Sequence, residues 1–480
     1  MTRSLLSLAS LLGLAHLSLA FNCAIPPIYV DIHKRIVHGT NIFQYGSFIG
    51  VGTPAQNQSL WPSLKQNETS VAFFKFCQNS NLTNCEDSTN GNFETTESDT
   101  FTRTDSYDTT DNISAGDDSF FGTDILRLYT HYFESDGPTQ NNVTSFPVEV
   151  VTEGNKSPGV VGMGLESTLL QKLFKDGLVA GRTFSLFIGH GFDRAAGVIN
   201  GSVTFGGYDV GRFQGEVHNF TMDPRDTYPL EVTVSDIVIN DSTGLVRNVS
   251  LLDRSRFPDL PEGSNTFNAK LTTDQHPFSF PYEITQNYMD LLAAVETDEP
   301  DKSLRLNKPF NGTMTVKLNT GLEITVPSNV MFNNSGLSPV AAREKRDNTS
   351  FYLGTAFLGQ AYLMVDYDAY KFHIAQAIVE QKYVQPRTFC PKSVPIAYIR
   401  PKQSEFMKQG LIGAVIGGVV GGCGFITLLI CLFCLWKRRR YIKQQELEEN
   451  HGKAKFAPFE IDDKGSVESK KKPNVMFWKT

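Results

Sequence analysis

Between residues 21 and 391 the chain consists mainly of short apolar runs that alternate with polar residues and are broken by Gly, Asn, Asp and Pro. Two examples are "GSVTFGGYDVG", which starts at Gly201, and "GTMTVKLNTGLEITVPS", which starts at Gly312. Alternation with a period of two, bounded by turn residues, predicts β-strands. Many such segments with few helical ones predict an all-β fold.

One stretch, "LESTLLQKLFKDGLV", has helical spacing instead. Leu169, Leu170, Leu173 and Val179 fall near one face of a helix, and Gly177 stands near its end. Apolar residues three or four apart followed by Gly predict an amphipathic helix that ends there.

The pattern also repeats. The segments "GVVGMG" (159–164) and "YLGTAFL" (352–358) both place two apolar residues before a Gly, late in each half of the region. A chain of 480 residues is too long for one typical domain. We therefore expect two similar lobes, at approximately 21–215 and 216–391.

Both ends of the chain carry targeting signals. Residues 1–20 combine Arg3, a short apolar run and a site of small residues, which is typical of a secretory signal peptide. Residues 411–436 hold no charge and are long enough to cross ~30 Å of hydrocarbon. The cluster "KRRR" (437–440) follows at once, so the positive-inside rule places the C-terminus in the cytosol.

The segments around the membrane span complete the expected order. Residues 392–410 are interpreted as a stalk, and residues 437–480 as a disordered cytoplasmic tail whose partners the sequence does not indicate. The basic cluster could contact anionic lipid or serve only to stop transfer. The expected location is the plasma membrane or another membrane of the secretory pathway, with a single pass and the ectodomain outside or in the lumen.

Glycosylation signals and charge agree with this topology. All the Asn-x-Ser/Thr sequons precede the span. All of them are predicted glycosylation sites except Asn155, whose sequon is followed directly by Pro158. The predicted sites are Asn57, Asn67, Asn81, Asn112, Asn142, Asn200, Asn219, Asn240, Asn248, Asn311, Asn333 and Asn348. The tail carries 12 basic and 7 acidic residues, the signal peptide one basic residue, and the chain −7 in all, so residues 21–436 hold about −13. That charge argues against nucleic acid as a partner.

Four of the seven cysteines precede the membrane span. An even number in an oxidising compartment predicts two disulfides. Cys77 and Cys85 close a short loop and are expected to pair, which leaves Cys23 with Cys390. We find no Cys/His spacing typical of a metal site and expect neither a metal nor a cofactor.

Five segments in order then resemble the pepsin-like aspartic peptidases. They are "YGSFIGVGTPAQ" (45–56), "FFGTDIL" (120–126), "SPGVVGMGLESTLLQKLFKDGLVAGRTFSLFIG" (157–189), "GSVTFGGYDVGRFQGEV" (201–217) and "YLGTAFLGQAYLMVDYDAYKFHIA" (352–375). The resemblance implies a bilobal fold with a cleft between the lobes, and it points to a membrane-anchored member from a fungus. Cys77 and Cys85 stand where the family has its first-lobe disulfide, whereas the usual second-lobe disulfide has no counterpart.

The family carries Asp-Thr/Ser-Gly in each lobe, and its two carboxylates share a proton and activate one water. Counted from Gln56, the first motif falls on Ser63-Leu64-Lys65. Counted back from Pro281, the second falls on Thr272-Thr273-Asp274. Neither Ser63 nor Thr272 is an acid, so no catalytic residue is expected at the dyad positions; Asp274 is a weak candidate.

The resemblance also implies which residues face a ligand. Lys65, Thr273 and the flap candidate Tyr107 are expected to line the cleft. The leading hypothesis is a single-pass type I membrane glycoprotein whose pepsin-like ectodomain is a pseudopeptidase that binds or senses peptides or protein partners. The alternatives are an active aspartic-type endopeptidase with a non-standard dyad and a structural cell-surface glycoprotein.

Overall fold

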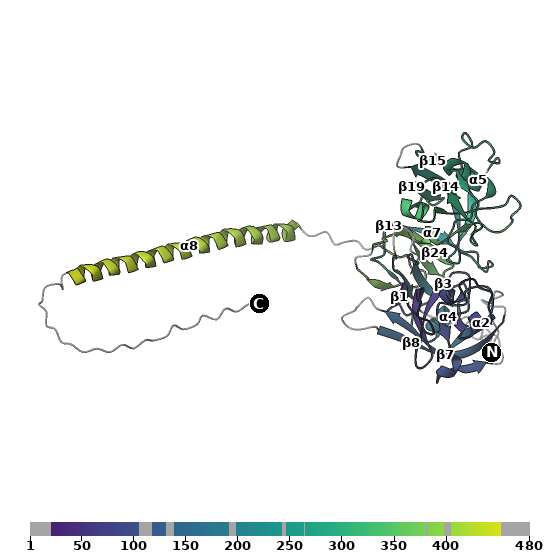
Figure 1. Ribbon diagram of the computed structural model, residues 1–480, viewed down its shortest axis with the longest axis horizontal. Helices are drawn as coiled ribbons and strands as arrows, with labels where there is room; N and C mark the ends of the chain where they lie inside the picture. The colour runs from purple at the N-terminus through teal and green to yellow at the C-terminus, as the bar shows by residue number, and fades with distance from the viewer. Residues whose placement is uncertain are drawn as a thin grey trace, which may run out of the picture. The chain divides into compact units, whose positions relative to one another are not determined.

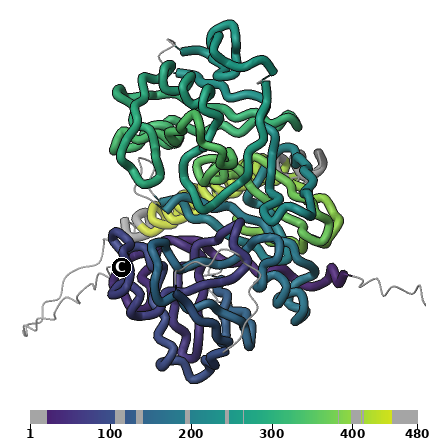
Figure 2. Tube along the Cα trace, turned by 90° about the vertical axis from the view of Figure 1, so that its right-hand side faces the viewer, coloured from purple at the N-terminus to yellow at the C-terminus, as the bar shows by residue number. Residues whose placement is uncertain are grey.

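The computed structural model describes residues 21–104, 118–130, 139–191, 198–241, 246–263, 265–380, 383–397 and 405–452 (Figure 1). The chain forms two units, residues 1–398 and 399–480. The first unit is mostly β, as the alternating pattern predicts, and it has two lobes. Figure 2 shows the first half of the chain in the lower lobe and most of the second half in the upper lobe.

The largest sheet has 14 strands and contains strands from both halves of the chain. Its strands are β1 (Ile28–Ile36), β2 (Phe43–Val51), β3 (Gln56–Ser63), β4 (Ser70–Phe73), β5 (Asn92–Phe93), β6 (Thr102–Thr104), β7 (Asp118–Thr130), β8 (Thr139–Glu153), β9 (Val160–Gly162), β10 (Thr183–Phe187), β11 (Gly201–Phe205), β13 (Phe213–Thr221), β23 (Ala361–Asp366) and β24 (Lys371–Ala377). The antiparallel pair β10–β23 joins the halves, with Phe184 opposite Val365. This pairing joins strands that are far apart in sequence.

The second lobe is built on smaller sheets. Its six-stranded sheet contains β14 (Glu231–Asp241), β15 (Val249–Ser250), β16 (Phe267–Leu271), β19 (Gly312–Leu318), β20 (Glu323–Val326) and β22 (Tyr352–Leu353). The remaining strands are β17 (Ala294–Val295), β18 (Ser303–Leu306) and β21 (Leu337–Ala341) in one sheet, and β12 (Gly207–Asp209) and β25 (Pro386–Thr388) in another. The predicted lobe boundary at residue 215 falls inside β13, which pairs with β24.

Short helices lie between the strands. They are α2 (Phe76–Asn79), α3 (Cys85–Ser88), η1 (Thr95–Glu97), α4 (Thr168–Lys175), α5 (Tyr282–Leu292), α6 (Ser328–Met331) and α7 (Thr355–Leu358). The helix predicted from the leucine spacing is α4. Its N-cap Ser167 accepts a hydrogen bond from the Leu170 N–H, and Leu169, Leu170 and Leu173 are buried.

Both predicted disulfides are confirmed. Cys77 pairs with Cys85 between α2 and α3, and Cys23 pairs with Cys390. Near the second bond the Thr388 hydroxyl donates to the Ile25 carbonyl over 2.8 Å. The two ends of the first unit are therefore tied together covalently.

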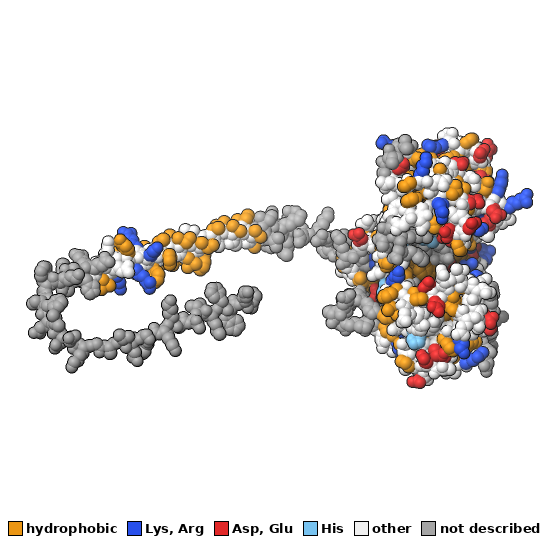
Figure 3. All heavy atoms as spheres, in the orientation of Figure 1, with side chains coloured by type: hydrophobic (Ala, Val, Ile, Leu, Met, Phe, Trp, Pro, Cys, Tyr) orange, Lys and Arg blue, Asp and Glu red, His pale blue; other side chains and the backbone are white. Residues whose placement is uncertain are grey.

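The described part of the second unit forms one helix, α8 (Glu405–Gly452). Residues 413–447 of it are a candidate membrane span that is long enough to cross a bilayer and is apolar as far as Trp436. Hydrophobic side chains cover most of its length, and Lys and Arg side chains gather toward one end (Figure 3). The helix exceeds the predicted span at both ends. The expectation of a disordered tail is wrong for residues 437–452, because "KRRRYIKQQELEENHG" is rich in strong helix formers and continues the helix.

Candidate functional site

The two motif positions lie at equivalent places in the lobes. In the first lobe β3 runs parallel to β9, with Ser63 opposite Gly162. In the second lobe β16 runs parallel to β22, with Leu271 opposite Leu353. The Met163 N–H donates to the Ser63 carbonyl (2.9 Å), and the Thr272 N–H donates to the Leu353 carbonyl (3.1 Å). Strand β3 thus ends at Ser63, and β16 ends one residue before Thr272, each beside a parallel strand.

A glycine lets each motif loop pack against the neighbouring chain. A Cβ on Gly162 would lie 2.4 Å from the Asn67 carbonyl oxygen. A Cβ on Gly354 would lie 2.5 Å from the His276 carbonyl oxygen. Both contacts are with backbone atoms, so the repeat of two apolar residues before a Gly marks two close approaches that only glycine permits.

The two motif loops also contact each other across the lobes. The Leu64 N–H donates to the Thr273 hydroxyl over 3.2 Å, and the Trp61 indole N–H donates to the Thr273 carbonyl over 3.0 Å. The reciprocal bond cannot form through the side chain of Leu64, which has no hydroxyl. The donors of both bonds therefore belong to the first lobe, and both acceptors belong to Thr273 in the second.

The side chains at the dyad positions are buried and neutral. Ser63 is 0% exposed and Thr272 is 3% exposed. The Ser63 Oγ accepts hydrogen bonds from the N–H groups of Lys65 (3.3 Å) and Gln66 (3.2 Å). At pH 7 neither hydroxyl can supply the charged carboxylate that a general base requires.

Asp274 is an acid beside these positions. Its backbone N–H donates to the Thr272 hydroxyl over 3.1 Å, and its side chain reaches solvent although protein atoms surround the carboxyl. The surrounding protein desolvates the carboxyl and raises its pKa, although a hydrogen bond with Ser63 and the charges of Lys65 and Lys156 oppose that effect. One carboxyl and two cations therefore lie in the neighbourhood of the two motif loops.

This raised pKa predicts a pH-dependent effect of Asp274→Asn. Because the folded state binds more protons than the unfolded state between the two pKa values, the contribution of Asp274 to stability is greatest below the unfolded pKa and falls as the pH rises through the folded one. The variant should therefore have a higher Tm than wild type at pH 7, and the gain should disappear below about pH 4. Thermal unfolding between pH 3 and pH 8 measures this.

Asp253→Asn provides the matched control. Hydrogen bonds from Ser255 lower the pKa of the exposed Asp253 carboxyl, so this variant should change stability in the opposite direction at pH 7. Equal Tm shifts in the two variants at pH 7 would contradict the assignment of Asp274.

The structure corrects one of the three predicted cleft residues. Thr273 is 2% exposed, and its hydroxyl and carbonyl both accept hydrogen bonds from the first lobe, so it braces the lobes and does not line a binding surface. Lys65 is exposed near the start of the loop between β3 and β4. Tyr107 lies outside the described residues, as does the sequon at Asn112.

The sequons in the described part of the ectodomain differ in accessibility. Asn57, Asn81, Asn142, Asn200, Asn219, Asn240, Asn248, Asn311 and Asn348 are exposed, and Asn67 is half-buried. Asn333 does not fit the prediction. It is 5% exposed, and its Oδ1 accepts hydrogen bonds from the N–H groups of Ser335 and Leu337, so the folded chain has no room for a glycan there.

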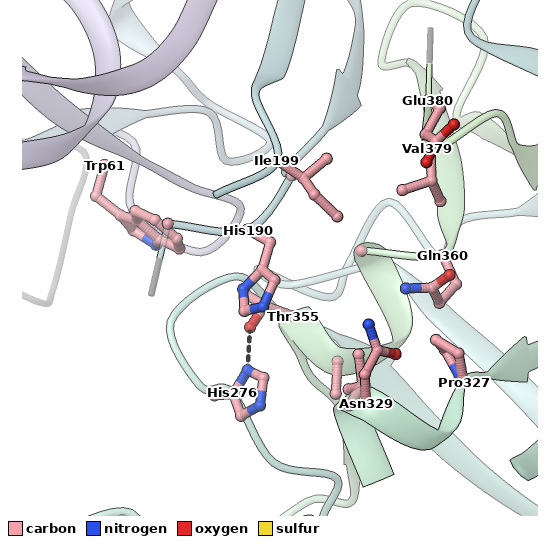
Figure 4. Close-up of a pocket in the computed structure, with 15 residues that line it drawn as sticks. Trp61, His190, Ile199, His276, Pro327, Asn329, Thr355, Gln360, Val379 and Glu380 are labelled. Carbon is pink, nitrogen blue, oxygen red and sulfur yellow. Dashed lines mark hydrogen bonds between the residues drawn. The ribbon is translucent and has the colours of Figure 1, made fainter. Parts of the chain in front are cut away.

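A pocket of about 360 Å³ next to the motif loops was not predicted from the sequence. Trp61, His190, His276 and Thr355 line part of it, and His276 Nδ1 lies 2.9 Å from the Thr355 hydroxyl (Figure 4). These residues come from separate segments of the chain, and no motif unites them. Trp61 and His276 each stand two residues from a motif position, so the pocket touches both motif loops.

A metal centre finds no support among the residues that the structure describes, where no group of three or more His, Cys, Asp or Glu side chains could hold an ion. The chemistry that these residues offer is hydrogen bonding and charge: a carboxyl, two lysines and buried hydroxyls.

The fold and the site define a class: a bilobal β protein in which two equivalent strand-and-glycine motifs meet between the lobes. A family model described as eukaryotic aspartyl protease matches residues 44–377. The chain belongs to this pepsin-like aspartic peptidase family.

Two named relatives are fungal. The chain is 25% identical to "Secreted aspartic protease 9" of Candida albicans over 314 residues, which are 61% of this chain and 53% of that protein. It is 24% identical to "Aspartic proteinase 3" of Saccharomyces cerevisiae over 319 residues, which are 60% of this chain and 51% of that protein. The chain thus spans about half the length of the curated relatives it matches.

Proposed function

We propose that this chain is a membrane-anchored, non-catalytic member of the family that binds peptides or protein partners between its lobes. The observation that carries the proposal is the chemistry at the dyad positions, where the buried hydroxyls of Ser63 and Thr272 stand in place of two carboxylates. Loss of one general acid or base typically reduces a rate ~10² to 10⁴-fold. Two are missing here.

The close approaches at Gly162 and Gly354 and the brace at Thr273 support a retained scaffold. Affinity for an extended peptide comes largely from backbone hydrogen bonds and side-chain pockets, and neither needs the dyad. Lys65 and Lys156 both act on Asp274, which gives the motif region a net positive charge among these three side chains. We infer a preference for peptides that carry carboxylates.

The proposed topology is single-pass type I, with a glycosylated ectodomain outside the cell or in the lumen, and with α8 in the plasma membrane or another membrane of the secretory pathway. The candidate span at 413–447 supports a membrane anchor, and the basic cluster that follows its apolar part at 437–440 supports this orientation.

A rival function is an endopeptidase that uses Asp274. Its raised pKa suits a general acid, and this observation alone favours the rival. A purely structural surface glycoprotein is the remaining alternative.

One experiment separates the three. Full-length protein in detergent is incubated with denatured protein at about pH 3 to 6, around the ordinary carboxyl pKa near 4, and also probed on an array of acidic, neutral and basic peptides. We expect no cleavage, retention of acidic peptides, and loss of that preference in Lys65→Ala. Pepstatin-sensitive cleavage that is abolished by Asp274→Ala would establish the rival enzyme, and retention of no peptide would leave the structural role.

A further inference from the structure

Helix α8 carries two cysteines near its basic end. Cys431, Cys434 and Cys423 are exposed free thiols. With a rise of 1.5 Å per residue, Cys434 lies about 4.5 Å along the axis from Lys437, Cys431 about 9 Å, and Cys423 about 21 Å. Two thiols are therefore near the basic boundary, and the third is deep within the apolar span.

An aromatic residue marks the same boundary independently. The Arg440 guanidinium lies 3.7 Å from the centre of the Trp436 ring. Trp is enriched at membrane–water interfaces, where its ring is apolar and its surroundings are polar. The Trp436 ring, with the Arg440 guanidinium over it, therefore fits a position at the membrane–water interface. Cys434 is two residues from Trp436 and so lies within one helical turn of that interface.

The helix also brings the cysteines and cations to one face. Residues three and four apart are neighbours on a helix surface, so Cys431 and Cys434 are adjacent, and Lys437 and Arg438 follow Cys434 by one turn. Cations in this position attract an anionic thiolate and the phosphates of an acyl-coenzyme A. No such cation lies within a turn of Cys423 along the apolar segment.

We propose that Cys434 and Cys431 are S-acylation sites that take a long-chain fatty acyl group. In this transfer the cysteine sulfur forms a thioester bond to the acyl carbonyl carbon, the thioester bond to coenzyme A breaks, and coenzyme A leaves as its thiol with the cysteine proton. No oxidant or reductant is consumed. A membrane acyltransferase that uses fatty acyl-coenzyme A supplies the reaction.

The proposal rests on the proposed topology, because acyl-coenzyme A is available on the cytosolic side. The acyl chain would lie beside the apolar part of α8, with its carbonyl at about the depth of Trp436. The distances of the three cysteines from Lys437 along the helix axis determine which variants to compare. Cys434→Ser, Cys431→Ser and the double variant test the sites, and Cys423→Ser is the control for a thiol that the enzyme cannot reach.

The test uses the full-length chain with a C-terminal tag, expressed in yeast cells that are fed an alkyne analogue of palmitate. We expect hydroxylamine-sensitive label on wild type and on Cys423→Ser, a reduced signal in each single variant, and at least a tenfold loss in the double variant. Equal expression and equal protease resistance of the ectodomain show that the serine variants fold.

Two outcomes overturn the proposal. Label that persists in the double variant would place the acyl group elsewhere, and unlabelled wild type would exclude acylation. Protease added to sealed microsomes, whose outer face is cytosolic, tests the topology separately, and protection of the C-terminal tag would identify a failure of the topology. Digestion of the tag with no label means that the topology stands and the acylation sites do not.

Discussion

Gly354→Ala is expected to destabilise the second lobe by at least about 3 kcal/mol, which exceeds the effect of most single substitutions. The new Cβ would lie 2.5 to 2.7 Å from the carbonyl oxygens of His276, Gln275 and Pro277. All three are backbone atoms, and the first residues of α7 hold this segment in place. The Thr355 N–H donates to the Gln275 carbonyl over 2.9 Å, and the Ala356 N–H donates to the His276 carbonyl over 3.2 Å. The loop must therefore move away from Gly354, and with it the motif at Thr272.

The measurement is thermal unfolding of the full-length chain in detergent, followed by near-ultraviolet circular dichroism, with secretion yield as a second readout. Gly359→Ala is the matched control at the end of α7. The φ of Gly359 is −70°, and a Cβ added there would lie 3.1 Å from its nearest neighbour, the Thr355 carbonyl oxygen. The substitution Gly359→Ala should therefore destabilise the protein much less than Gly354→Ala. If the two variants unfold at the same temperature, the close packing at Gly354 is not what holds the motif loop.

The same features show what the sequence could reveal. Strand alternation, the leucines of α4 and the pairs Cys77–Cys85 and Cys23–Cys390 depend on local spacing or on elimination among few residues, and the structure confirms them. The repeated pattern before Gly162 and Gly354 also predicted equivalent lobes, because a glycine that recurs at one place in a motif usually permits a close approach.

Other features depended on contacts between distant segments. The pairing of β10 with β23 joins residues that lie about 180 positions apart, and no local pattern encodes such a partner. Thr273 was expected to line the cleft because it belongs to the motif of the second lobe. Its hydroxyl instead accepts a hydrogen bond from the Leu64 N–H of the first lobe. The pocket at Trp61 and His276 was missed for the same reason: its walls come from separate segments.

The brace at Thr273 bears on whether the family's Asp-Thr-Gly motifs can be introduced into this chain. Thr273 already occupies the second position of its motif and already accepts the Leu64 N–H. A threonine at position 64 would supply the hydroxyl for the reciprocal bond, and glycines at positions 65 and 274 would remove a cation and a carboxyl from the loops. Strand β3, which ends at position 63, and strand β16, which ends just before position 272, would otherwise need no change.

Full restoration of the motifs is therefore expected to create acid endopeptidase activity. The variant combines Ser63→Asp, Leu64→Thr, Lys65→Gly, Thr272→Asp and Asp274→Gly. The positions of the two introduced carboxyls are buried at 0% and 3% exposure, so the pair should share one proton and titrate in two separated steps. We expect cleavage of denatured protein at about pH 3 to 5 that is at least ~10²-fold faster than in wild type and is inhibited by pepstatin.

The control variant carries the same changes except that Asn replaces Ser63 and Thr272. Asparagine has nearly the shape of aspartate but cannot ionise, so this variant should fold like the restored one and remain inactive. Activity in the asparagine control would mean that a contaminating peptidase or an unrelated acid does the cleavage. Inactivity of the restored variant, with an unchanged Tm, would contradict this prediction. It would show that the scaffold around the two loops does not hold a water molecule between the introduced carboxylates.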